Sequence, residues 1–213
     1  FTAADLAPEP KAIYERSADI FANNRKKFFE QTVSEALLET ESKLTGLTAE
    51  KLLDAEIAKL PQPTEATIKE IYDLNRASLG DRTLEQTRNQ IVGFLMKDQI
   101  EKAEADLVAS LKIKHKYTTG KDVNAVGLKP ADILFTIAGT PFTARRFDES
   151  NRIALSDVRV HIYEEILAGL EDAVLNKLIN IEAAARNVDS STLIATEVTD
   201  KMRDFSAGER AKL

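Results

Sequence analysis

The chain has 213 residues, of which 43% are apolar and 30% charged, and it carries a formal charge of −6 with a pI near 5.2. These values suit a globular protein of one or two domains. They argue against nucleic acid as a partner, because a phosphate-binding surface needs an excess of Lys and Arg. The lack of cysteine excludes a disulfide, a thiolate nucleophile and a thiolate metal site. No apolar run approaches the roughly 20 residues of a membrane span, so we expect no transmembrane segment.

Apolar residues at helical spacing dominate the first half of the chain. They predict one long helix, or two nearly continuous helices, from Ile13 to Leu44, and Gly46 is expected to end it. Gly93 lies inside the last predicted helix of this half, which extends over about 30 residues, and we expect it to mark a close packing contact. The N-caps predicted for the three helices after Gly46 are Thr48, Thr64 and Thr83.

The centre of the chain departs from this pattern. KIKHKY, residues 112–117, alternates basic and apolar side chains, which suits a half-exposed strand or the frayed end of the preceding helix. ILFTIAGTPFT, residues 133–143, predicts a short strand and a turn, and the strand could pair with 112–117. Thr143 is then expected to cap a return to helix, with a further short helix around Leu193. The predicted fold class is therefore mainly α, with at most a small two-stranded β element.

A weak internal repeat is found when the chain is shifted by 141 residues. Nine of 57 paired positions are identical, against about three or four expected from ordinary residue usage. Gly46 pairs with Asn187, and both residue types readily adopt the left-handed conformation that ends a helix. Thr48 pairs with Asp189, and both types are good N-caps. The alternative is that two unrelated helix breaks use the same common types of helix-ending and capping residues.

The repeat defines two predicted copies, 1–125 and 126–213. Phe1-Thr2-Ala3 pairs with Phe142-Thr143-Ala144, so the first copy would lack its leading strand and the chain would be a piece of a longer protein. Ser206 would be the counterpart of the Thr64 cap if the shift is lengthened by one residue. We expect that the missing strand leaves an edge that two chains could exchange, which would produce a strand-swapped or domain-swapped homodimer.

ILFTIAGTPFTARRF, followed by a long helix ending in LINIEAAARNVDSSTLIATEV, resembles the N-terminal module of SurA-type periplasmic chaperones and related foldases. In that family a short strand leads to a Thr that caps a helix, and a long helix later ends at a Gly before a short helix. Asn187 stands where Gly is usual. ALLETESKLTGLTAEKLLDAEI fits the second motif with Gly46 in the usual place.

This resemblance implies a non-catalytic, ATP-independent module that binds unfolded polypeptides in the bacterial periplasm or otherwise outside the cytoplasm. Similar regions precede DsbA-like thioredoxin domains or parvulin domains, so the parent protein could be a thiol-disulfide oxidoreductase or a prolyl isomerase. The first alternative is a dimerisation or spacer arm for such an enzyme. The second is that this chain is itself an enzyme, although its sequence shows no convergent group of polar residues.

Candidate site residues are few. Phe21, Phe28, Phe29 and Phe94 are the residues that we predict to contact a polypeptide, with core packing as the alternative for each. No catalytic, cofactor-binding or metal-binding residue is predicted. The two histidines, His115 and His161, lack metal-ligand spacing; His115 is expected to be exposed among lysines and His161 to lie on a helix surface.

Overall fold

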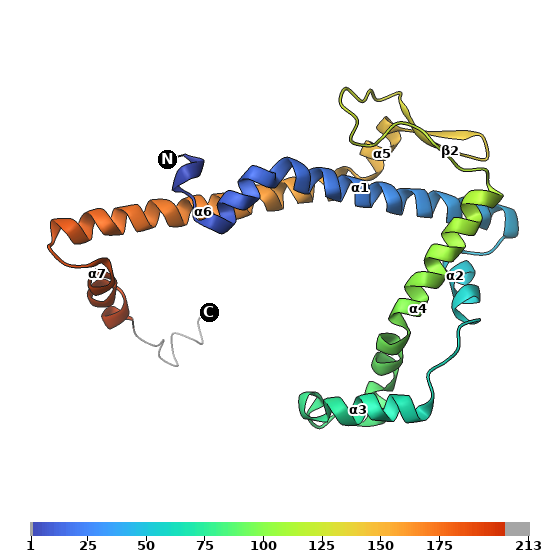
Figure 1. The fold of residues 1–213 in the computed structure, drawn as a ribbon, viewed down its shortest axis with the longest axis horizontal. Helices are drawn as coiled ribbons and strands as arrows, with labels where there is room; N and C mark the ends of the chain where they lie inside the picture. The colour runs from blue at the N-terminus through green and yellow to red at the C-terminus, as the bar shows by residue number, and fades with distance from the viewer. Residues whose placement is uncertain (1, 203–213) are drawn as a thin grey trace, which may run out of the picture. The chain divides into compact units, whose positions relative to one another are not determined.

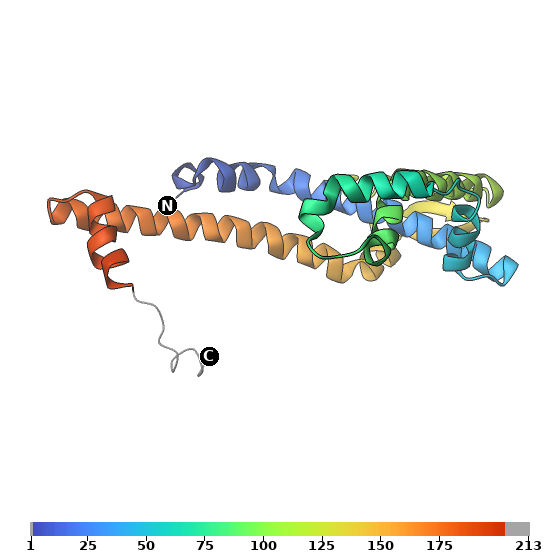
Figure 2. The same cartoon turned by 90° about the horizontal axis from the view of Figure 1, so that it is seen from below.

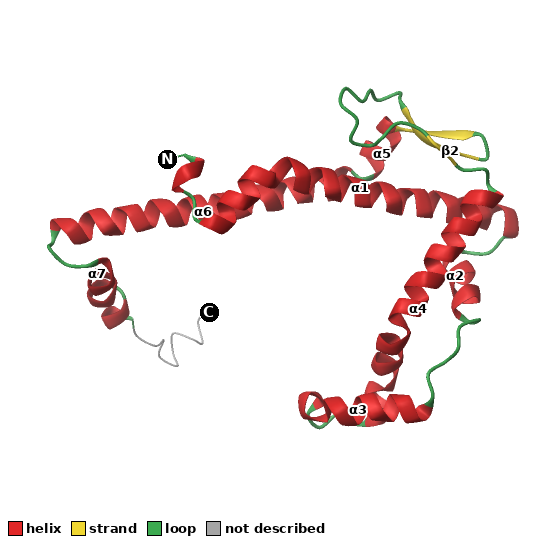
Figure 3. Ribbon diagram, viewed as in Figure 1, coloured by secondary structure: helices red, strands yellow, loops and turns green. Residues whose placement is uncertain are grey.

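The computed structural model describes residues 2–202 (Figure 1). Helices dominate this range, and its strands form one small sheet (Figure 3), so the predicted mainly α fold is confirmed. The helices are η1 Ala3–Asp5, α1 Pro8–Thr45, α2 Ala49–Ile57, α3 Glu65–Leu79, α4 Leu84–Lys114, α5 Ala144–Ser150, α6 Arg152–Ala185, α7 Ser190–Glu197 and η2 Thr199–Lys201.

The helix starts follow from local side-chain chemistry. At the start of η1, α2, α3, α4, α5 and α7, a Thr or Asp side chain accepts a hydrogen bond from a backbone N–H that has no partner inside the helix. Thr83 also forms a capping box, in which Gln86 Oε1 accepts from the Thr83 backbone at 2.8 Å. Ser206 lies outside the described residues. The confirmed caps and their donors are Thr48 with Lys51, Thr64 with Thr67, Thr83 with Gln86, Thr143 with Arg146 and Asp189 with Thr192.

Both predicted helix breaks have the expected backbone. Gly46 has φ +73° between α1 and α2, and Asn187 has φ +53° between α6 and α7. The chain thus passes twice through the same order of long helix, left-handed residue, capping residue and short helix. The spacing of 141 residues predicted from the sequence therefore coincides with a repeated local geometry.

The chain divides into two compact units, one made of Phe1–Asn24 with Ile153–Leu213 and the other of Arg25–Arg152. This division groups residues by contact. The predicted copies 1–125 and 126–213 group residues by internal similarity, and they remain a prediction.

In the Arg25–Arg152 unit, the sheet lies beside the C-terminal part of α1 (Figures 1 and 2). Phe135 of the sheet and Phe147 of α5 are almost completely buried. The Phe29 ring of α1 meets them edge to face, with centroid distances of 5.7 and 6.2 Å, and Phe142 stacks on Phe135 at 4.6 Å. An aromatic core therefore holds α1, the sheet and α5 together.

The same unit has a second core between α3 and α4. Ile68, Tyr72 and Ile91 are its buried residues. The Tyr72 hydroxyl donates to the Arg82 carbonyl at 2.9 Å, which satisfies its polar end. Gly93 faces open space on α4, since no atom outside the local helix lies within 4 Å of where a Cβ would be. The prediction that Gly93 marks a close contact is therefore wrong.

The sheet has three antiparallel strands in the order β1-β2-β3: β1 Thr118–Thr119, β2 Ile133–Ile137 and β3 Thr140–Thr143. The β2–β3 turn places Ala138 at φ +50° and Gly139 at φ +79°, as a type I′ hairpin requires. The predicted strand and turn are thus present, but the segment supplies two strands. The small β element has three strands where at most two were expected.

The partner of β2 also differs from the expectation. Residues 112–114 complete α4, and β2 pairs with Thr118 and Thr119 rather than with KIKHKY. Of the two alternatives for that segment, the helix end is the one observed. Lys116, at φ +51°, turns the chain from the helix toward the sheet. Residues 112–114 are helical rather than extended because adding a residue to an existing helix costs less than starting a strand, and α4 is some thirty residues long.

In the unit formed by Phe1–Asn24 and Ile153–Leu213, the first part of α1 packs against α6. A Cβ on Gly169 would overlap the Pro10 ring, so a side chain at 169 would separate the two helices. The Arg159 guanidinium lies 4.5 Å from the Phe21 ring centroid. Leu193 of α7 and Ala183 of α6 are buried, which holds the short helix against the long one.

Candidate functional site

A groove of about 560 Å³ lies within the Arg25–Arg152 unit where α1, α2 and α4 come together. Most of its lining is apolar, and each helix contributes. The apolar lining residues are Phe29, Val33 and Leu38 of α1, Leu53 of α2, Ala105, Val108 and Ala109 of α4, and Tyr117 beyond α4.

The α4 wall of the groove follows from helical spacing. Ala105, Val108 and Ala109 are three and four residues apart, so they lie on one face of the helix. Two of the three are alanines, which leaves room that larger side chains would fill. Val33 on the opposite wall is buried. The groove is therefore a shallow apolar surface that comes from the choice of small residues on α4.

The charged residues of the groove are mainly acidic. Glu30 of α1 and Glu101 and Glu104 of α4 line it together with one cation, Lys112. Lys112 Nζ lies 5.3 Å from the Tyr117 ring centroid. The charged side chains that line the groove therefore carry a net negative charge.

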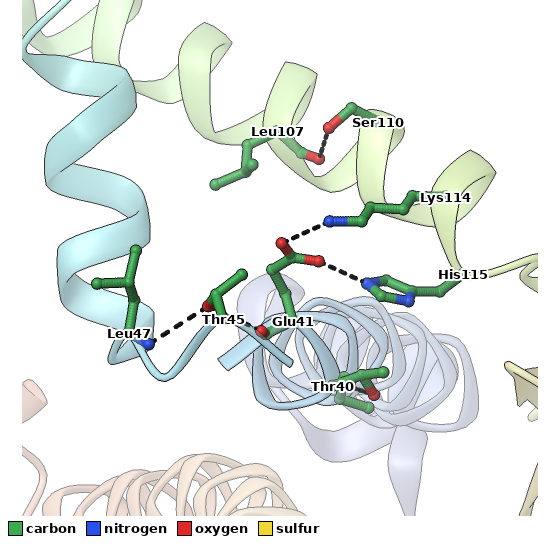
Figure 4. Close-up of polar contacts among 9 residues, drawn as sticks. Thr40, Glu41, Thr45, Leu47, Leu107, Ser110, Lys114 and His115 are labelled. Atoms are coloured by element: carbon green, nitrogen blue, oxygen red, sulfur yellow. Dashed lines mark hydrogen bonds and ion pairs between the residues drawn. The ribbon is translucent and has the colours of Figure 1, made fainter. Parts of the chain in front are cut away.

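A buried carboxylate fixes the end of α4 on α1 next to this groove (Figure 4). Glu41 Oε1 accepts from Lys114 Nζ at 2.7 Å, and Glu41 Oε2 lies 2.9 Å from His115 Nε2. The Glu41 and His115 side chains are only 7% and 4% exposed, whereas that of Lys114 is 55% exposed. The hydrogen bond from Lys114, assisted by that from His115, holds the pKa of Glu41 below its ordinary value against the opposing effect of burial.

His115 is therefore not an exposed residue among lysines, and that prediction is wrong. It caps α4, where the chain turns back toward the sheet, and its carbonyl oxygen accepts from the Ala138 backbone at 2.6 Å. The ring is thereby directed inward to Glu41, while the neighbouring lysines reach solvent. His161 does lie on a helix surface, with its side chain 75% exposed and its Nε2 3.8 Å from Glu165 Oε1.

Arg25 holds the other side of the unit together. Its Nε donates to the Val123 carbonyl at 3.0 Å, and its terminal nitrogen lies 2.7 Å from Asp148 Oδ1. The guanidinium also lies 5.1 Å from the Phe147 ring centroid. One side chain thus connects α1 to the 120–132 loop and to α5, which keeps the sheet against the helix that forms the groove.

The four predicted phenylalanines are dispersed by the structure. Phe29 is half-buried, packs in the aromatic core and lines the groove. Phe94, 69% exposed on α4, lines a second groove of about 320 Å³ with Ile71, Leu79 and Ile91. Phe21 is half-buried beneath Arg159, and Phe28 is half-buried outside the grooves described here. Polypeptide contact by these residues stays a prediction.

Sequence reasoning missed most of the groove. Leu53, Val108 and Tyr117 belong to segments far apart in the chain, and only the packing of α2 and α4 on α1 brings them together. The alanine face of α4 was a usable signal, because small residues at helical spacing allow close approach or leave a groove. Nothing in the sequence could say which of the two applies.

Comparison of the chain with protein-family models, curated proteins and solved structures found no match. Across residues 2–202, no helix has both the length and the apolar character to cross a membrane. Over the same span, the histidine, aspartate and glutamate side chains form no group of three or more that could hold a metal ion.

Proposed function

We propose that this chain is a non-catalytic, ATP-independent module that binds unfolded or extended polypeptides weakly. The observation that carries the proposal is the apolar groove among α1, α2 and α4. An apolar surface binds by the area it removes from water, so it accepts many sequences, provided that they present apolar side chains. The second groove, beside Phe94, would add contacts of the same kind.

The cellular setting belongs to the same proposal and rests on the resemblance to SurA-type modules. We place the chain in a bacterial cell-envelope protein that assists the folding of exported proteins. The acidic residues Glu30, Glu101 and Glu104 support a preference for clients whose apolar segments are flanked by Lys or Arg.

The direct test is suppression of aggregation. An unfolded client protein is diluted into buffer with and without excess chain, and light scattering is followed in the absence of ATP. We expect the chain to lower the scattering. Scattering that is unchanged at excess chain contradicts the proposal.

A matched pair of variants assigns the activity to the groove. Ala105→Trp places a large side chain in the groove from an exposed position, and Gln99→Trp places the same side chain on an exposed part of α4 outside it. We expect the first variant to weaken binding of a labelled apolar peptide by about tenfold and the second to have little effect. Equal effects would mean that the groove is not the site.

Sedimentation separates this function from that of a dimerisation or spacer arm. A chain that binds polypeptide sediments as one species with the labelled peptide attached. A tight dimer that ignores the peptide would favour the arm instead.

A further inference from the structure

The two helix breaks differ in what covers them, although they share a local geometry. The α1–α2 elbow ends the first long helix, and the α6–α7 elbow ends the second. Each elbow is the end of a long helix, a left-handed residue and a short helix. The equivalent and identical residues on the long helices are Glu30 and Glu171, Val33 and Val174, Leu37 and Leu178, and Glu41 and Glu182.

At the first elbow this face is covered. Leu37 is 0% exposed, and its neighbours on α1 line grooves shared with α4 and with the β2–β3 hairpin. The C-terminal end of α4 presents buried Leu111 and then the two groups that bond Glu41, namely Lys114 and His115. The covering element is thus a helix end with an apolar residue followed, about one turn later, by a lysine and a histidine.

At the second elbow the counterpart of Leu37 is exposed. Leu178 is 58% exposed, and Leu175 and Ile181, three residues to either side, are 56% and 59% exposed. These three side chains form a stripe along α6, because residues three apart lie on one helix face. Ile194 of α7 is also an exposed apolar residue.

The carboxylate at this elbow pairs with a residue of its own helix. Glu182 Oε1 pairs with Arg186 one turn further along α6 at 2.7 Å, and Arg186 also bonds Glu197. The Glu182 side chain is 51% exposed, whereas its counterpart Glu41 is buried against Lys114 and His115 at the end of α4. The second elbow thus presents an exposed apolar stripe that ends at a carboxylate. At the first elbow, the end of α4 supplies the apolar side chain and the hydrogen-bond donors that such a surface can bind.

We propose that the α6–α7 elbow is a docking surface for a partner helix with the chemistry of the α4 end. That helix is amphipathic, presents an apolar face to Leu175, Leu178 and Ile181, and carries a Lys or His in its last turn against Glu182. A cation there also suits the negative end of the partner's own helix dipole. This site is separate from the groove among α1, α2 and α4 and does not depend on its function.

The test uses the intact chain and a labelled synthetic peptide of residues 98–117, which carries the α4 end. We expect saturable binding by fluorescence anisotropy and a loss of about tenfold in affinity for Leu178→Asp. Ile153→Asp is the matched control, because it is the same kind of change at an exposed position near the start of the same helix. We expect it to bind like the unmodified chain.

A charge exchange tests the polar contact without altering the apolar stripe. Glu182→Lys should weaken binding several-fold, and a peptide with Lys114→Glu and His115→Glu should recover part of the loss with that variant. Circular dichroism checks that each variant keeps its helices. No saturable binding, equal losses for Leu178→Asp and Ile153→Asp, or no recovery on charge exchange would overturn the proposal. So would sedimentation showing that the chain dimerises through Leu178.

Discussion

Glu41 and His115 are 74 residues apart in the sequence, yet their side chains meet at 2.9 Å in the interior of one unit. The contact ties the last turns of α1 to the end of α4, and Lys114 completes it from the solvent side. Since α1 and α4 also bound the groove, the geometry of the groove depends on the contacts of Glu41 with Lys114 and His115.

Glu41→Gln should therefore destabilise the chain. Gln keeps the size of the side chain but removes the negative charge that Lys114 and His115 bond, and we expect the free energy of unfolding to fall by about 1–3 kcal/mol. Urea unfolding at pH 7 measures the change. Glu39→Gln is the control, because Glu39 is exposed and pairs with the exposed Lys43, an interaction worth at most about 1 kcal/mol. Equal losses in the two variants would show that the buried contacts of Glu41 stabilise the chain no more than an exposed ion pair does.

The same carboxylate predicts an acid-sensitive contribution to stability. The pKa of Glu41 in the folded chain lies below its ordinary value of 4.5. A depressed carboxylate pKa stabilises the fold fully above the unfolded-state value and loses that effect as the pH falls through the folded-state value. The stability difference between the unmodified chain and Glu41→Gln should thus shrink as the pH falls from about 5 to below about 4. Urea titrations across that range measure it, and a difference that grows there would contradict the assignment.

Arg25→Lys should be destabilising despite conserving the charge. The planar guanidinium contacts the Val123 carbonyl, Asp148 and the Phe147 ring face at the same time. The compact ammonium group of Lys cannot make all three contacts. We expect a loss of about 1–2 kcal/mol in the free energy of unfolding. Arg88→Lys is the comparison, because Arg88 pairs with Glu65 at an exposed site. A loss at Arg88 as large as that at Arg25 would refute the interpretation.

Two glycines should respond to alanine in opposite directions. A Cβ on Gly120 would overlap the Ile133 carbonyl oxygen beside the β1–β2 pairing, so Gly120→Ala should destabilise the sheet by about 2 kcal/mol or more. Gly93→Ala adds a methyl group to open space in the middle of α4 and should stabilise the chain by about 0.5–1 kcal/mol. Thermal unfolding followed by circular dichroism compares the two. Stabilisation by Gly120→Ala, or destabilisation by Gly93→Ala, would show that the backbone contacts are not as described.

Much of the fold could be predicted because local interactions set where the helices begin and end. Thr48, Thr83 and Asp189 cap helices through bonds to residues three positions away, and Gly46 and Asn187 end helices through their own backbone preference. Such interactions lie within one turn, so the order of residue types specifies them.

The candidate site could be predicted only in part. Phe29 and Phe94 were identified as candidate contact residues and do line grooves, but Phe21 and Phe28 have the same residue type and line neither. Helical periodicity shows that a side chain lies on an apolar face. It does not show whether another helix covers that face, because covering depends on segments that are distant in the sequence.

The sequence by itself determined the helices, the caps predicted for them, the two left-handed breaks and one strand with its turn within residues 133–143, since each depends on neighbours within a few positions. Only the tertiary structure decided that β2 pairs with Thr118 and Thr119, that His115 is buried against Glu41, and that Leu37 is covered while its counterpart Leu178 is exposed. Burial and long-range pairing depend on which surfaces meet, and two identical residues on equivalent helices can differ in both.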